Sequence, residues 1–152
     1  MRIHIVLDNI RSAFNVGSIF RSCDGAGSVE KIYLCGLTTP IDNPKLDKTA
    51  LGATEMIPSE HYDTTDEALK EIKDQKIPIY AVELVENAKH FQKFKYPNTF
   101  ALVFGHEKKG VEENTLGLCD DVIYIPMRGK KESLNVANAA SILLYEVTRN
   151  LE

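Results

Sequence analysis

The residues with the clearest chemical potential are Ser133, Leu134 and Asn135, near the C-terminal end of the chain. An apolar pattern of helical spacing follows directly, so they lie at the start of a predicted helix. Free backbone N–H groups and the positive end of the helix dipole can bind a polar or anionic ligand at such a start. Ser133 or Asn135 can equally cap the helix through a side-chain oxygen. The segment alone leaves both a ligand site and a simple pair of caps open.

Two glycine-containing segments and one serine resemble known motifs only in part. Residues 25–27 read Gly-Ala-Gly at the end of a predicted helix, without the third glycine of a dinucleotide fingerprint. Residues 105–110 have glycines spaced as in a P-loop, but Val111 follows where that motif requires lysine. Ser133 and His106 are residue types of a hydrolytic triad, yet no nucleophile elbow surrounds the serine. Dinucleotide, nucleoside triphosphate and serine hydrolase chemistry are therefore disfavoured.

Short apolar strand patterns alternate with helical patterns along the chain, which predicts an α/β fold. The sheet is expected to be mostly parallel, with helices on both faces. The predicted strands are 3–7, 31–35, 79–84, 100–104 and 122–125, with a further candidate at 55–57. The predicted helices run from a cap at Asn15 to Gly25 or Gly27, from a cap at Thr64 or Thr65 through Ile72, from Glu112 to Leu118, and from Asn135 through Leu151.

The composition, with 43% hydrophobic residues in a chain of 152, suits a single compact domain over residues 1–152. Cys23, Cys35 and Cys119 are widely spaced, and no Cys/His ligand cluster accompanies them. A disulfide framework and a metal site are therefore not expected, and a reducing cytoplasm fits best. The sequence shows no signal peptide and no long apolar segment, so we expect no membrane association.

The formal net charge of −4 argues against a protein that coats nucleic acid through overall basicity. The basic residues in predicted loops can form a local patch that binds nucleic acid, or they can be ordinary solvated surface. The short basic groups in predicted loops are Lys45 with Lys48, Lys108 with Lys109, and Arg128 with Lys130 and Lys131.

Three segments together form a far more specific pattern than any one of them. They are residues 9–27, residues 102–111 with the sequence Leu-Val-Phe-Gly-His-Glu-Lys-Lys-Gly-Val, and Ile-Pro-Met at 125–127 followed by Ser-Leu-Asn-Val at 133–136. In order and spacing they closely resemble the three motifs of the SpoU/TrmH branch of the SPOUT RNA methyltransferases. The resemblance covers nearly the whole chain.

This resemblance implies an S-adenosylmethionine-dependent enzyme that methylates a ribose 2′-hydroxyl of tRNA or rRNA. It also implies a cytoplasmic homodimer and a SPOUT-type fold with a C-terminal trefoil knot, an exception to the general absence of knots. The small residues of the last predicted helix would let another backbone approach closely, either an internal element or a second subunit. The positions that match the family's cofactor-binding loops are Val82, Glu83, Leu84, Gly105, Ile125, Met127, Ser133 and Leu134.

The polar residues that match the family's functional positions are Asn15, Arg21, Glu107, Ser133 and Asn135. Methyl transfer requires the ribose oxygen in line with the methyl carbon, and a proton must leave. The family proposal assigns the base role to Arg21, which is demanding because a guanidinium holds its proton tightly. We expect Arg21 to bind the neighbouring phosphate and orient the hydroxyl, with a partial role as base left open. We expect the hydroxyl to be positioned by Asn15, Ser133 and Asn135. Glu107 would anchor Arg21 or Asn15.

Two features depart from the family's pattern. Many relatives carry an additional RNA-binding domain, whereas the catalytic core here runs from Ile3 to Leu151, so recognition is expected from the core, its dimer partner or another protein. Lys108 and Lys109 replace the usual residues after Glu107. Two alternatives stay open: a SPOUT-like dimer that binds RNA without turnover, and an unrelated enzyme that uses a nicotinamide or flavin.

Overall fold

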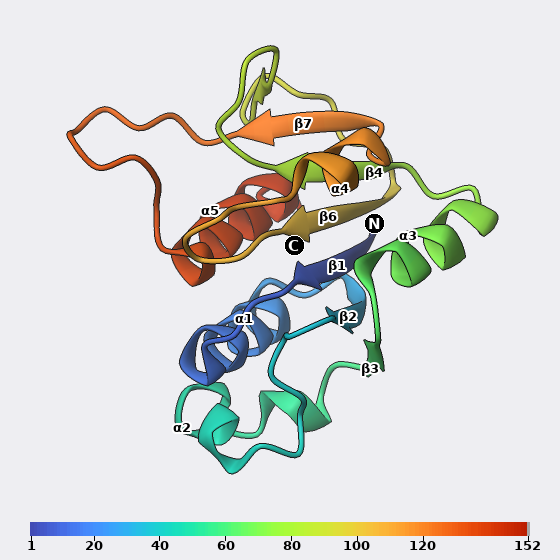
Figure 1. Cartoon of the computed structure of the whole chain (residues 1–152), viewed down its shortest axis with the longest axis vertical. Coiled ribbons are helices and arrows are strands. Elements are labelled where there is room, and N and C mark those ends of the chain that lie inside the picture. Colours follow the sequence, from blue (N-terminus) through green and yellow to red (C-terminus); the bar gives the residue numbers. More distant parts are fainter. Residues whose placement is uncertain (152) are drawn as a thin grey trace.

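The fold is built on one parallel sheet. The computed structural model describes residues 1–151, and Glu152 lies outside the described residues. Within them, seven strands follow the order β3-β2-β1-β6-β4-β7-β5, and each neighbouring pair is parallel (Figure 1). The strands are β1 (Arg2–Asp8), β2 (Val29–Cys35), β3 (Ser59–Tyr62), β4 (Ile79–Val82), β5 (Lys89–His90), β6 (Thr99–Phe104) and β7 (Asp121–Tyr124). The predicted α/β fold with a parallel sheet is confirmed.

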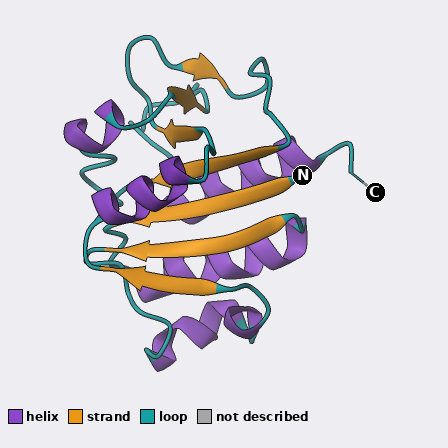
Figure 2. Cartoon of the chain, turned by 90° about the vertical axis from the view of Figure 1, so that its right-hand side faces the viewer, coloured by secondary structure: helices purple, strands orange, loops and turns teal. Residues whose placement is uncertain are grey.

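Helices cover both faces of this sheet (Figures 1 and 2). On one face, α1 (Ala13–Ala26) and α5 (Val136–Thr148) pack against each other in the same buried cluster as Leu102 of β6. The next residue of β6, Val103, belongs to the opposite face, where α3 (Thr65–Asp74) lies. Successive strand residues point to opposite faces, so a strand covered on both sides must be apolar at every position. This explains the continuous apolar run in β6.

The remaining helices are short. They are α2 (Asp47–Ala50), α4 (Glu113–Gly117) and two 3-10 turns at Pro44–Leu46 and Ala53–Glu55. None of the helices in the described part of the chain has both the length and the apolar character needed to span a bilayer.

The start of α1 corrects one prediction. The helix begins at Ala13, and Ser12 is its N-cap, because the Ser12 hydroxyl oxygen accepts the N–H of Asn15 at 3.2 Å. Asn15 therefore lies inside the first turn, and its side chain is free for another role.

Other boundaries also differ from the predictions. The candidate strand at 55–57 is wrong: the N–H of Ile57 continues a turn to the carbonyl of Ala53 at 3.3 Å, and β3 begins only at Ser59. The last helix ends at Thr148 rather than at Leu151. The strand predicted at 79–84 ends at Val82, which places Glu83 and Leu84 in the following loop.

Candidate active site

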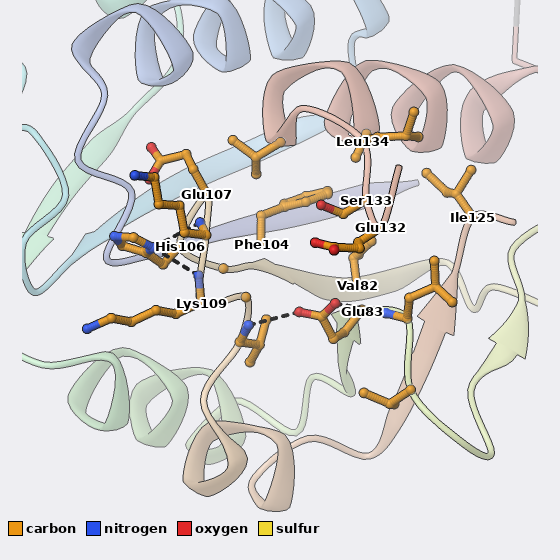
Figure 3. A pocket seen from close by; sticks show the side chains of 18 of the residues that line it. Val82, Glu83, Phe104, His106, Glu107, Lys109, Ile125, Glu132, Ser133 and Leu134 are labelled. Carbon is orange, nitrogen blue, oxygen red and sulfur yellow. Dashed lines mark hydrogen bonds between the residues drawn. The ribbon is translucent and has the colours of Figure 1, made fainter. Parts of the chain in front are cut away.

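A cavity of about 400 Å³ lies beside the carboxyl ends of three neighbouring strands, β6, β4 and β7 (Figure 3). Because these strands are parallel, their carboxyl ends lie at the same edge of the sheet, where α/β proteins bind ligands. The N-terminal residues Val136 and Ala139 of α5 also line the cavity. Its size is that of a site for a cofactor or small substrate.

The cavity collects the residues that the sequence assigned to cofactor binding. All eight line it: Val82, Glu83, Leu84, Gly105, Ile125, Met127, Ser133 and Leu134. They come from three loops that are far apart in sequence.

The loop after β6 is folded tightly onto itself. The N–H of Gly110 donates to the carbonyl of His106 at 2.8 Å, which closes the loop. Inside it, His106 Nδ1 accepts the N–H groups of Lys108 and Lys109 at 3.1 and 3.2 Å. A Cβ on Gly105 would lie 2.4 Å from the backbone carbon of Gly110, so only glycine allows this closure. The loop thus presents a fixed wall to the cavity.

Glu107 joins this loop to the beginning of α1. Its Oε1 accepts the N–H of Ser12 at 3.0 Å. Burial alone would raise the pKa of the Glu107 carboxyl, but hydrogen bonds from the backbone of Ser12 and Arg11 and from the Asn15 side chain outweigh burial and lower this pKa. Glu107 is therefore a carboxylate at neutral pH, held at the edge of the cavity.

Asn135 connects the same region to α5. Its Oδ1 accepts the N–H of Asn138 at 3.1 Å, so Asn135 rather than Ser133 is the helix cap. Its Nδ2 donates to Asn15 Oδ1 at 3.1 Å. Asn15 and Asn135 are thus linked by a hydrogen bond, Glu107 is bonded to Ser12 at the start of the helix that carries Asn15, and Ser133 lines the neighbouring cavity.

Arg21 lies elsewhere in the same chain. Its side chain is exposed on α1, and it lines an open groove with Lys48, Thr49 and Tyr145 instead of the main cavity. Six residues of helix correspond to about 1.7 turns, so Asn15 and Arg21 point to different sides of α1. Four of the five predicted catalytic residues therefore lie at or beside the main cavity within one chain. Arg21 lies apart from them.

The cavity is also lined by residues to which the sequence assigned no cofactor-binding role, namely His106, Glu132, Val136 and Ala139. His106 and Val136 belong to the second and third motifs. The signal for Ala139 was its place in the first turn of a helix that follows the predicted ligand segment. Among the described residues, no group of three or more His, Cys, Asp or Glu side chains could hold a metal ion.

Residues 2–145, nearly the whole chain, match the SpoU rRNA Methylase family. The chain belongs to this family. The relationship predicted from the three motifs, to the SpoU/TrmH methyltransferases, is confirmed.

This chain is similar to proteins named as tRNA methyltransferases and to proteins named as rRNA methyltransferases. It is 33% identical, over 95% of its length and 73% of the relative's, to the tRNA (guanosine(18)-2′-O)-methyltransferase of Thermus thermophilus. It is 32% identical, over 95% of its length and 58% of the relative's, to the 23S rRNA (guanosine-2′-O-)-methyltransferase RlmB of Vibrio parahaemolyticus. Among solved structures, the SpoU methyltransferase AviRb of Streptomyces viridochromogenes in complex with AdoMet superposes with a TM-score of 0.90 at 26% identity, covering 98% of this chain and 60% of AviRb.

Proposed function

We propose that this chain transfers a methyl group from S-adenosylmethionine to a ribose 2′-hydroxyl of tRNA or rRNA. The observation that carries the proposal is the single cavity that the loops after β4, β6 and β7 form, lined by every position that matches the family's cofactor loops. The match to this family over residues 2–145, together with relatives named as RNA 2′-O-methyltransferases, supports the same reaction.

The residues of the cavity fit this cofactor chemically. Val82, Leu84, Ile125 and Leu134 provide apolar walls for a nucleoside base. Carboxylates and ammonium groups both line the cavity, as a ligand with a cationic sulfur and an amino-acid end requires. These groups are Glu107, Glu132, Lys108 and Lys109. The bound cofactor supplies an activated methyl group.

The linked polar residues are placed to hold the accepting ribose. Asn15 and Asn135 are joined to each other, and Glu107 holds the start of α1 against the cavity loop. We assign Asn15, Ser133 and Asn135 to positioning of the hydroxyl, and Arg21 to the neighbouring phosphate, which its planar fork suits. A role for Arg21 as full base is not assigned, because a guanidinium holds its proton tightly.

The position of Arg21 supports a homodimer. α1 and α5 pack side by side, with Ser22 Oγ and Ser141 Oγ 2.6 Å apart, and Ile142 and Tyr145 of α5 are exposed. We propose that this face binds a second copy of the chain, which would place Arg21 between the two subunits. Light scattering at micromolar concentration should give the mass of a dimer, and a monomer would contradict the proposal.

We also propose that residues 1–152 form one domain that acts in the cytoplasm and that its C-terminal part is knotted. The continuous seven-stranded sheet supports one domain, and family membership supports the knot. Heating should give one unfolding transition, and fractionation of cells should recover the protein with cytoplasmic RNA. When the chain is stretched from its two ends, a knot would leave it shorter than a fully extended chain of the same length. Full extension would contradict the knot.

The alternative of an RNA-binding dimer without turnover is not favoured, because the relatives that the chain matches are named as enzymes. The decisive experiment combines purified protein, labelled S-adenosylmethionine and RNA from cells that lack the gene. We expect 2′-O-methylation of this RNA and little of RNA from unmodified cells, where the site is already methylated. Binding of S-adenosylhomocysteine without transfer to any RNA would favour the alternative, and absence of binding would overturn the proposal.

A further inference from the structure

Glu83 occupies an unusual place in the cavity. It follows the last residue of β4, and both of its carboxylate oxygens are engaged by backbone groups of the protein (Figure 3). Oε1 accepts the N–H of Leu84 at 2.9 Å, and Oε2 accepts the N–H of Val111 at 3.0 Å. The second contact joins two loops whose residues are 28 positions apart in sequence.

Gly110 makes this contact sterically feasible. A Cβ at this position would lie 2.1 Å from Glu83 Oε2, and the backbone has a φ of +68°, which L side chains rarely adopt. The carboxylate therefore sits in a space that exists only because residue 110 is glycine. Hydrogen bonds from N–H groups to a carboxylate are stronger than those to a neutral acceptor.

We infer that Glu83 is a positioning residue for cofactor binding, acting through the loop after β6 rather than by direct contact with the cofactor. The inference rests on the proposed function. Glu83 fixes the distance between the loop after β4 and residues 105–111, and with it the width of the cavity. The same loop carries Glu107, so its displacement also moves the carboxylate that holds the start of α1.

The first test is Glu83→Gln. Whichever way the amide is turned, one of the two backbone N–H groups faces an NH₂ group and loses its acceptor. We expect the Kd for S-adenosylhomocysteine to rise at least about tenfold, the cost of a lost charge-assisted hydrogen bond. Glu86→Gln, an exposed glutamate three residues later, should leave this Kd unchanged.

Gly110→Ala tests the contact between Glu83 and Val111 by filling the space that the Glu83 carboxylate occupies. Its matched control is Gly52→Ala, which also has a positive φ, of +89°, but has no atom within 4 Å of the added Cβ. Both variants carry backbone strain, and only Gly110→Ala should weaken cofactor binding. The double variant Glu83→Gln with Gly110→Ala should bind no more weakly than the weaker of the two single variants, because both substitutions break one contact.

Amide hydrogen exchange gives a readout that does not depend on the cofactor. In Glu83→Gln, the N–H of Val111 should exchange at least about tenfold faster, while the amides of β1 keep their protection. Unchanged exchange at Val111, unchanged Kd in Glu83→Gln, or additive effects in the double variant would each overturn the inference. A wild-type protein that binds no S-adenosylhomocysteine would instead overturn the proposed function, and the exchange measurement would still decide the role of Glu83.

Discussion

At the scale of single residues, Arg21 is the predicted catalytic residue whose surroundings constrain it least. Asn15 is bonded to Asn135 and Glu107 to the backbone of Ser12, whereas Arg21 makes no side-chain hydrogen bond or ion pair with any residue that the structure describes. An exposed side chain without such partners suits a group that takes up a fixed position only when a phosphate binds.

This freedom leads to a prediction for Arg21. Arg21→Ala should lower the single-turnover rate of methylation by about 100-fold or more, the effect of losing orientation at the reacting atoms. Affinity for S-adenosylmethionine and the melting temperature should stay close to wild type. Arg21→Lys should fail as well, because an ammonium cannot form the bidentate fork, whereas Arg2→Ala, an exposed arginine of β1, should be silent. Near-normal turnover in Arg21→Ala would exclude the assignment.

Glu107 predicts a dependence of stability on pH. Its folded pKa lies below its ordinary value, so it stabilises the protein above the unfolded pKa of about 4.3, and this contribution disappears as pH falls through the folded pKa. Glu107→Gln should therefore be less stable than wild type at pH 7, with the difference shrinking below about pH 4. Denaturant titrations of both proteins from pH 7 to pH 3 would measure this. A difference that is constant over the whole range would show that the charge of Glu107 is not involved.

At the scale of elements, Asn135 makes two separate contacts at the beginning of α5. The Asn135 oxygen caps the helix, and its NH₂ group reaches Asn15 on α1. The first contact concerns stability and the second concerns the geometry of the polar network, so the two can be separated by substitution.

We predict different effects for two variants of Asn135. Asn135→Ala should lower the free energy of unfolding by about 0.5–2 kcal/mol, because the cap is lost, and should lower turnover. Asn135→Asp keeps a capping oxygen and a favourable charge at the helix start but cannot donate to Asn15. It should be as stable as wild type and still slow in methylation. An active Asn135→Asp protein would show that the bond to Asn15 is dispensable.

At the scale of the whole molecule, the net charge of −4 must be reconciled with an RNA substrate. We propose that RNA binds to a local group of basic residues. Lys108 and Lys109 are exposed beside the cavity. The loop between β7 and α5, which carries Arg128, Lys130 and Lys131, projects from the body of the protein in Figure 1. RNA would then meet a group of positive charges next to the site.

This charge distribution predicts the salt dependence of RNA binding. Affinity should fall steeply with salt, and Lys108→Ala with Lys109→Ala should weaken binding and reduce the slope of log K against log salt by up to about 1.4, or ~0.7 for each contact to single-stranded RNA. The matched control is Lys70→Ala with Lys73→Ala, which removes two exposed lysines of α3. Equal slopes for all three proteins would remove Lys108 and Lys109 from the RNA interface.

The sequence predicted the strands β1, β2, β4, β6 and β7, because a buried parallel strand leaves a clear trace, such as the run at 100–104. It missed the short edge strands β3 and β5, whose residues are mostly polar and at least partly exposed. It failed at the start of α1, where Ser12 and Asn15 are both good capping residues and only the observed hydrogen bond distinguishes them. It assigned Glu83 to the cofactor loops, but it could not reveal the contact with Val111, because this contact depends on two distant loops meeting in space. Likewise, the motif that contains both Asn15 and Arg21 does not say that the helix turns them to different sides.

The way the cavity is assembled from widely separated loops also affects the order of events during synthesis. Its walls come from residues 82–85, 104–111 and 125–139, and the second strand beside β1 is β6, which follows much later in the chain. At about 5–20 residues per second, a ribosome needs seconds to pass from β4 to α5, and during that time the emerging chain has no complete cofactor cavity. S-adenosylmethionine therefore cannot guide early folding, and binds only after α5 has docked on α1.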